Sequence, residues 1–229
     1  PFEKHFQEKY ARNYTEIAAV LGEPTNLTSC EIGHRGNVFM KVTTHGDSGH
    51  GSKPENIKTH AILENIKVID KIINLGQILA VSLKDSILQS PSFCLTGIQS
   101  GQSSLNTVPL SCSSTWDIRT TPKLHYKVLK LMKKELGDKV DIKCLEKPSP
   151  SGYTSPNSKI VQLLKVFVPD LEVKVSPGSN DICFFTSAGI DAVTFGPGQK
   201  EAIHKENEYV ELAKIQQAIH LYKRIIKEF

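Results

Sequence analysis

A histidine near the end of the chain has neighbours typical of a binding site. His204 lies in the segment FGPGQKEAIHKENE (195–208), where a glycine-proline-glycine turn precedes it and charged and amide side chains follow. A neutral imidazole is a natural metal ligand, and its second ring nitrogen then needs an orienting partner. Glu206 and Glu208 are both close enough in sequence to be that partner. Taken alone, a histidine in a turn is more often an ordinary polar residue.

A carboxylate in the first part of the chain is the second candidate. Glu23 follows the short apolar run 17–21, which predicts a buried strand ending at the turn GEPT (22–25). A carboxylate at the C-terminal end of such a strand stands where α/β proteins place their sites. Gly196 and Gly198 would let the backbone turn sharply beside such a site. On spacing alone, Glu23 fits equally a glutamate in a surface turn.

Three further polar residues lie in the middle of the chain. His50 stands in the glycine-rich loop GDSGHGSKP (46–54), Asn106 in LNTVP (105–109), and Arg119 at the end of WDIR. The guanidinium of Arg119 suits a two-pronged grip on a carboxylate. The alternative for Arg119 is an ion pair with Asp117 or Glu135.

A turn in the last third of the chain also carries candidate residues. The run Gly178, Ser179, Asn180 and Asp181 separates a predicted strand from a short predicted helix over 182–187. Such a turn could line a pocket, and Asp181 could instead only cap the helix that follows.

The elements that must position these residues alternate between strands and helices. Residues 3–14 are compatible with a helix, and the part of the chain after 148 predicts helix 160–167, strand 171–175, a short helix, strand 192–195 and a final amphipathic helix. This alternation predicts a layered α/β domain.

A second domain is inserted into the first. Between Val38 and Leu145 the predicted order is βαββαβ, with a long helix that opens at Pro54 and Glu55, and this order is typical of a ferredoxin-like domain. The run PSPSG (148–152) then reads as a linker. The expected division is 1–33 and 148–229 for the α/β domain, with 34–147 inserted.

Composition excludes several classes of function. The 229 residues include 39% hydrophobic and 23% charged positions, enough for a globular core, and no apolar run is long enough to span a membrane. The net charge of +4 comes from interspersed lysines, and aromatics make up only 7%, so nucleic-acid binding is not expected. Five scattered cysteines without a CxxC pair indicate a reducing, cytoplasmic setting.

Four segments together resemble one known family. They are AAVLGEPT, GDSGHGSKP, LNTVP with WDIR, and FGPGQKEAIHKENE, and they occur in the family's order and spacing over nearly the whole chain. The family is the zinc-dependent amidohydrolases and exopeptidases of acetylornithine deacetylase, succinyl-diaminopimelate desuccinylase and carboxypeptidase G. The resemblance implies an α/β catalytic-domain portion interrupted by a ferredoxin-like lid and dimerisation domain.

The resemblance also implies roles for the candidate residues. Glu23 and His204 would each bind one of two zinc ions per subunit, with cobalt or manganese as alternatives. His50, acting from the neighbouring subunit of a homodimer, would stabilise the oxyanion. The substrate would be held by the remaining candidates, Asn106, Arg119, Gly178 and Ser179. The implied reaction is hydrolysis of the amide bond of an N-acyl amino acid by zinc-activated water.

Acetylornithine deacetylase is the closest member in the lid loop and tail, the desuccinylase is the runner-up, and a carboxypeptidase or dipeptidase comes third. The family's other zinc ligands and its general base belong to an N-terminal half that has no counterpart before Glu23. The one HxD match, His45 to Asp47, falls in the lid loop and reads as a chance match. The expectation is therefore a portion of an intact enzyme. The alternative of another class is a catalytically incomplete dimerisation or binding module.

Overall fold

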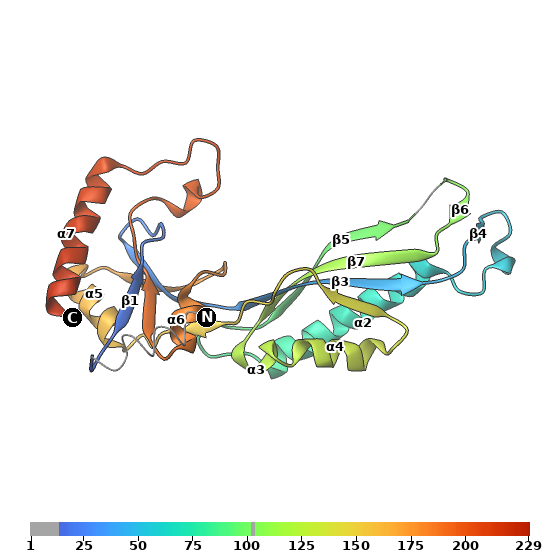
Figure 1. Ribbon diagram of the computed structural model, residues 1–229, viewed down its shortest axis with the longest axis horizontal. Coiled ribbons are helices and arrows are strands. Elements are labelled where there is room, and N and C mark those ends of the chain that lie inside the picture. Colours follow the sequence, from blue (N-terminus) through green and yellow to red (C-terminus); the bar gives the residue numbers. More distant parts are fainter. Residues whose placement is uncertain (1–13, 102–103) are drawn as a thin grey trace. The chain divides into compact units, whose positions relative to one another are not determined.

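The computed structural model describes residues 14–101 and 104–229, which form two compact units (Figure 1). We call residues up to Arg35 together with Ser151–Phe229 the split unit, and Gly36–Pro150 the inserted unit. The helix predicted over residues 3–14 lies, up to residue 13, outside the described residues. The chain is a mixed α/β protein with several sheets, as the sequence predicted.

The split unit is built on a mixed sheet with the strand order β1-β11-β2-β10, in which β9 also pairs with β2. Strands β1 and β11 run parallel and in register, from Ala18 opposite Asp191 to Leu21 opposite Thr194. Parallel strands end at the same edge of a sheet, so the segments that follow β1 and β11 leave it together. The five strands are β1 (Ala18–Leu21), β2 (Ser29–His34), β9 (Gly152–Tyr153), β10 (Glu172–Ser176) and β11 (Asp191–Thr194).

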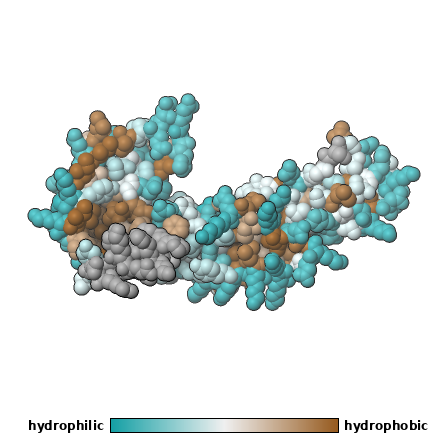
Figure 2. Space-filling view, viewed as in Figure 1, coloured by the Kyte–Doolittle hydropathy of each residue, from teal (hydrophilic) through white to brown (hydrophobic). Residues whose placement is uncertain are grey.

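Among the described residues of the split unit, three helices and a 3₁₀ turn accompany this sheet. Helices α5 and α7 lie side by side, and α6 packs against β2, β9 and β11 (Figure 1). Hydrophobic residues gather on and beside α7 (Figure 2), which buries Ala218, Leu221 and Ile225 at helical spacing. The elements are α5 (Lys159–Phe167), α6 (Ile182–Ser187), η3 (Lys200–Ala202) and α7 (Leu212–Glu228).

The inserted unit is an antiparallel sheet with the strand order β5-β7-β3-β8, and its two longer helices, α2 and α4, contact each other (Figure 1). A separate two-stranded ribbon joins β4 to β6. The strands are β3 (Gly36–His45), β4 (Gly49–His50), β5 (Ser92–Ser100), β6 (Thr107–Val108), β7 (Ser111–Thr120) and β8 (Asp141–Cys144). The helices are η2 (Pro54–Asn56), α2 (Ala61–Ser82), α3 (Pro122–His125) and α4 (Val128–Leu136).

The core of the inserted unit lies between the sheet and its helices. Burial alternates residue by residue along β3 and β7, so one face of each strand points inward. Trp116 and Met40 are fully buried on that face, and Ile72 of α2 and Met132 of α4 belong to the same cluster. Because β3 and β7 are packed in this core, they hold the loops at their ends in position.

The structure corrects one local prediction. The long helix predicted to open at Pro54 begins only at Ala61, because η2 is a separate 3₁₀ turn and hydrogen bonds to Thr59 interrupt the helix between the two. Thr59 N–H donates to the Asp47 carboxylate at 2.9 Å, and Thr59 C=O accepts from Asp47 N–H at 2.8 Å. The run predicted as a linker contains the boundary between the two units, at Pro150 and Ser151, and Ser149 within it exchanges two backbone hydrogen bonds with Asn37.

Within the described residues, no helix combines the length and the apolar character needed to cross a membrane.

Candidate functional site

Two segments that leave the split-unit sheet side by side form the first candidate site. One follows β1 and carries Glu23, and the other follows β11 and begins with Phe195 and Gly196. The N–H groups of Thr25 and Leu27 both donate to the carbonyl oxygen of Gly196, at 3.2 and 3.1 Å. These bonds fix the backbone around Glu23 against the Gly196 turn, while the Glu23 side chain stays exposed.

Two glycines make this close approach possible. A Cβ on Gly196 would lie 2.5 Å from the carbonyl oxygen of Gly22 and 2.7 Å from that of Glu23, much closer than a side chain tolerates. Gly198 has a φ of +92°, which disfavours any L side chain, and its carbonyl oxygen accepts from Asn26 N–H at 2.7 Å. The GPG turn is therefore required by the packing of the two segments.

The loop after this turn carries His204. The residue is exposed and has a left-handed backbone, with a φ of +61°. Its N–H donates to the Glu208 carboxylate at 3.1 Å. Of the two acidic residues proposed as ring partners, Glu208 thus contacts the backbone of His204, and no contact between Glu206 and the His204 ring is seen.

An ion pair with one buried partner anchors the start of the same loop. Lys200 of η3 pairs with Glu31 of β2, whose side chain is only 7% exposed. Desolvation lowers the pKa of Lys200, and the nearby charge of Glu201 acts in the opposite direction. Because an unpaired buried carboxylate is costly, the pair ties the His204 loop to the sheet.

A pocket of about 360 Å³ lies between the two segments, bordered on one side by Gly22 and Pro24 and on the other by residues 197–199 and 208–210. Glu23 stands between two of its lining residues, and Glu208 lines it directly. In the part of the chain that the structure describes, no three His, Cys, Asp or Glu side chains are grouped so as to hold a metal ion. Glu23 and His204 are residue types that bind metals, and the segments that carry them both border this pocket, but the described residues alone do not form a complete metal site.

The turn 178–181 is fastened to the end of β2. His34, fully buried, has its Nε2 2.8 Å from the carbonyl oxygen of Asn180, and the Ser179 hydroxyl donates to Arg35 C=O at 3.4 Å. The Asn180 side chain accepts from Ile182 N–H at 3.1 Å, so Asn180 caps α6. Asp181 makes no side-chain cap bond, which leaves its exposed carboxylate for another role.

The second candidate site lies in the inserted unit and brings together two of the predicted residues. His50 of β4 pairs with Thr107 of β6, and the Asn106 side-chain amide lies 3.0 Å from His50 Nε2. The other ring nitrogen, Nδ1, faces Ser52. This polar cluster is exposed, as a group that contacts a substrate must be.

Arg119 lies far from that cluster. Its Nε is 2.8 Å from one oxygen of Asp117 and its terminal nitrogen donates to the other at 2.9 Å, the ion pair that the sequence left as an alternative. In the β3–β7 ladder, Arg119 stands opposite Asn37, at the far end from the β4–β6 ribbon. Ten residues of strand separate the two ends, a length of about 30 Å.

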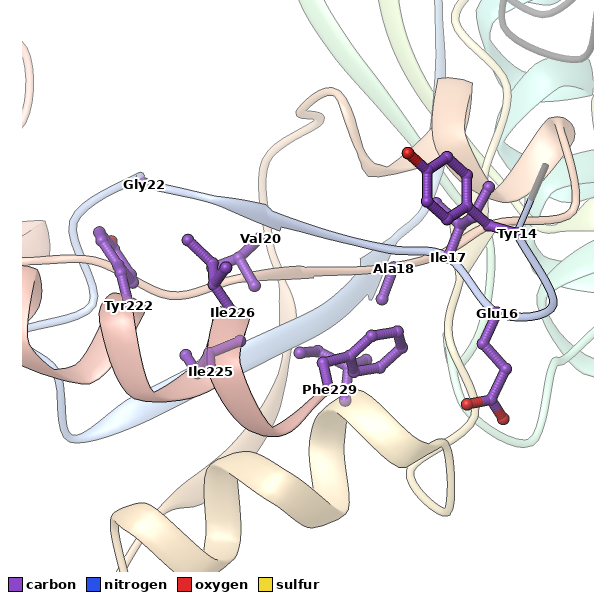
Figure 3. A pocket seen from close by; sticks show the side chains of 11 residues that line it. Tyr14, Glu16, Ile17, Ala18, Val20, Gly22, Tyr222, Ile225, Ile226 and Phe229 are labelled. Atoms are coloured by element: carbon purple, nitrogen blue, oxygen red, sulfur yellow. The ribbon is translucent and has the colours of Figure 1, made fainter. Parts of the chain in front are cut away.

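A larger hollow in the split unit carries little chemistry. It has a volume of about 640 Å³, and Figure 3 shows apolar side chains of β1 and α7, including Val20, Ile225 and Phe229, facing one another across it. Its one carboxylate, Glu16, is paired with Lys159 at 2.6 Å. The candidate site is therefore the smaller pocket beside Glu23.

Sequence reasoning missed several residues that support these sites. Glu31 and Lys200 are far apart in the chain, and nothing local links them. His34 was missed because strand β2 mixes polar with apolar residues and so lacks a clear pattern. Ser52 had no such signal, because its contact with the His50 ring depends on how the loop folds.

Comparison with known proteins identifies the family. The model for Peptidase family M20/M25/M40 matches residues 4–228, so the chain belongs to that family. Among curated proteins, it is 23% identical to a succinyl-diaminopimelate desuccinylase from Nitratiruptor sp., covering 97% of this chain and 62% of the relative. It is 28% identical to a desuccinylase of the same name from Rickettsia massiliae, covering 96% of this chain and 60% of the relative.

Solved structures show the same fold. A tripeptidase from Staphylococcus aureus superposes with a TM-score of 0.73 at 20% identity, over 96% of this chain and 59% of that one. A metallo-carboxypeptidase of family M20 from Sulfolobus solfataricus gives a TM-score of 0.68 at 17% identity, over 99% and 66%. The chain thus spans about three fifths of the length of the curated relatives it matches.

Proposed function

We propose that this chain forms part of a metal-dependent hydrolase that cleaves the amide bond of an N-acyl amino acid. The observation that supports this most is that a chain of the M20/M25/M40 family brings the Glu23 segment and the His204 loop to one pocket. Bound metal would lower the pKa of a water molecule so that it attacks the amide carbonyl. We expect two zinc ions per subunit, with cobalt or manganese as alternatives.

Glu23 and His204 would each supply one ligand. A catalytic zinc normally takes three protein ligands, so the others would come from residues outside those described. The Gly196 turn and the Lys200–Glu31 pair would hold the two ligand-bearing segments in place. The turn at Gly178 and Ser179 would line the substrate pocket, held by its bonds to the end of β2.

The identity of the group cleaved from the amino acid is proposed from the relatives. The curated relatives reported above are desuccinylases, which favours a succinylated substrate over the acetylated ornithine that the lid loop and tail suggested. The solved neighbours reported above are peptidases, which keeps a dipeptide or another short peptide as the third choice. All three substrate classes carry a free α-carboxylate. Arg119 would bind it in competition with Asp117, which occupies the guanidinium in this structure.

We propose further that one substrate is shared by two copies of the chain. If His50 stabilises the oxyanion while Arg119 holds the carboxylate, residues about 30 Å apart in one copy must serve one small molecule. A twofold dimer resolves this, because each site would take His50 from one copy and Arg119 from the other.

The inserted unit offers a surface for that dimer. The sheet order β5-β7-β3-β8 corresponds to the second, third, first and fourth of these strands in the sequence, and all neighbours are antiparallel. This order supports the proposal of a ferredoxin-like lid. Helix α2 carries exposed apolar side chains at helical spacing, and the edge strand β5 exposes Ile98. The exposed apolar residues of α2 are Leu63, Ile66, Ile73, Ile78 and Val81.

The decisive experiment uses the full-length protein. It is incubated with N-succinyl-diaminopimelate, N-acetylornithine or a dipeptide, before chelation, after chelation and after zinc is restored. We expect release of free amine from one class, lost on chelation and recovered with zinc. Glu23→Gln should lower both turnover and bound zinc, whereas Glu16→Gln, in the apolar hollow, should change neither. No turnover of any substrate by zinc-loaded protein would contradict the proposal and favour a binding module.

A further inference from the structure

The ring of His50 has a fixed hydrogen-bonding partner on one side. Its Nδ1 lies 3.2 Å from the backbone nitrogen of Ser52 and 2.7 Å from the Ser52 hydroxyl. A backbone N–H can only donate, so Nδ1 must be the acceptor and carry no proton. A neutral ring then holds its proton on Nε2.

We propose that Ser52 is a positioning residue that fixes the Nε2–H tautomer of His50. This inference rests on the proposed function, in which His50 donates a hydrogen bond to the oxyanion. With Nδ1 occupied by Ser52, Nε2–H is the one ring donor left for a substrate oxygen.

The surroundings of Nε2 agree with this tautomer. As drawn, the Asn106 side-chain NH₂ points at Nε2 at 3.0 Å, yet a neutral ring cannot accept at both nitrogens. The side-chain oxygen and nitrogen of an asparagine are assigned from such networks. Turning the amide by half a rotation lets Asn106 Oδ1 accept from Nε2–H. The NH₂ group then faces Ser104 Oγ, 2.7 Å from the other end of the amide, which can accept and pass its own proton to Thr107.

One directed chain of hydrogen bonds results. It runs from Ser52 N–H to Nδ1 of His50, and from Nε2–H through Asn106 and Ser104 to Thr107. The backbone holds its members together, since Gly51 N–H donates to Asn106 C=O at 2.7 Å. Asn106 thus keeps the donor occupied until a substrate oxygen replaces Oδ1, and Ser52 keeps the proton on the correct nitrogen.

Nitrogen NMR of the histidine rings in the 229-residue chain tests the proposal. We expect Nδ1 of His50 to resonate as an unprotonated nitrogen, with a coupling through the hydrogen bond to the Ser52 amide. Ser52→Ala removes one hydrogen bond and should lower the Nε2–H to Nδ1–H ratio about fivefold, which corresponds to ~1 kcal/mol. Ser52→Asp places an acceptor at Nδ1 and should move the proton there, while Ser52→Thr should behave as the wild type.

Ser48→Ala is the matched control, because the Ser48 hydroxyl, beside the same ribbon, donates to Val108 C=O at 3.0 Å rather than to His50. A protonated Nδ1 in the wild type would overturn the proposal. So would Ser52→Asp spectra identical to those of Ser48→Ala.

A kinetic arm separates this proposal from the proposed function. In the full-length enzyme, Ser52→Asp should lower kcat by about 100-fold, at the lower end of what loss of an oxyanion donor costs, with little change in KM. If the wild type turns over no substrate, the proposed function fails while the tautomer result stands. If it is active and Ser52→Asp keeps full kcat with its proton moved to Nδ1, the positioning role fails.

Discussion

Replacing Gly196 with alanine tests the packing that brings the two segments of the candidate metal site together. The added methyl would lie 2.5 Å from the carbonyl oxygen of Gly22, so the segments would have to separate by about 1 Å to reach van der Waals distance. That separation strains the hydrogen bonds from Thr25 and Leu27 to the Gly196 carbonyl. Overpacking of this kind costs about 1–3 kcal/mol, and we expect the upper end because hydrogen bonds are lost as well.

Hydrogen exchange of the β11 amides measures this cost in the split unit alone. A loss of about 3 kcal/mol should make amides such as Val193 exchange about 100-fold faster, if their exchange follows opening of the unit. Gly178→Ala is the control, because no heavy atom lies within 4 Å of the Cβ it would add. We expect that variant to be unchanged or stabilised by up to about 1 kcal/mol. Equal exchange rates in the two variants would refute the claim that the Gly196 turn must be a glycine.

Two further predictions concern buried titratable groups. Lys200→Met leaves the Glu31 carboxylate without its partner, and urea denaturation should show the split unit destabilised by about 1–3 kcal/mol. The double variant Lys200→Met with Glu31→Gln should recover most of that loss. No recovery would contradict the pairing. Burial lowers the pKa of His125 in the folded chain below its ordinary value of 6.5. Between the lowered pKa and pH 6.5, the unfolded chain therefore binds more protons than the folded chain. The inserted unit should lose stability as the solution is acidified through this range. Unfolding free energies measured against pH should show this loss in the wild type and less of it in His125→Gln; the same slope in both would contradict the assignment.

The family and the mixed α/β class could be predicted from the sequence, and both are confirmed, whereas the ferredoxin-like lid stays a prediction. Four short motifs in the right order carry family information that no single motif has. Strands β3 and β7 were predictable because burial of one face imposes a two-residue alternation that is visible locally.

The predictions failed where distant residues decide the structure. Helix α2 begins later than the proline at 54 suggests, because a separate 3₁₀ turn forms at 54–56 and Asp47 is hydrogen-bonded to Thr59. Local composition also could not reveal that Ser149, in the predicted linker, is hydrogen-bonded to Asn37, more than a hundred residues earlier. The Lys200–Glu31 pair is of the same kind. The directed bonds around His50 depend on atomic positions that spacing alone does not specify.

The most direct test of the central claim is complementation between two inactive variants of the full-length protein. His50→Ala and Arg119→Ala are each expected to lose most of the amide hydrolysis. If each site takes His50 from one copy and Arg119 from the other, refolding an equal mixture yields mixed dimers with one intact site. The mixture should then recover about one quarter of the wild-type activity. No recovery in demonstrably mixed dimers would contradict the account and place both residues in one copy's site or outside the site altogether.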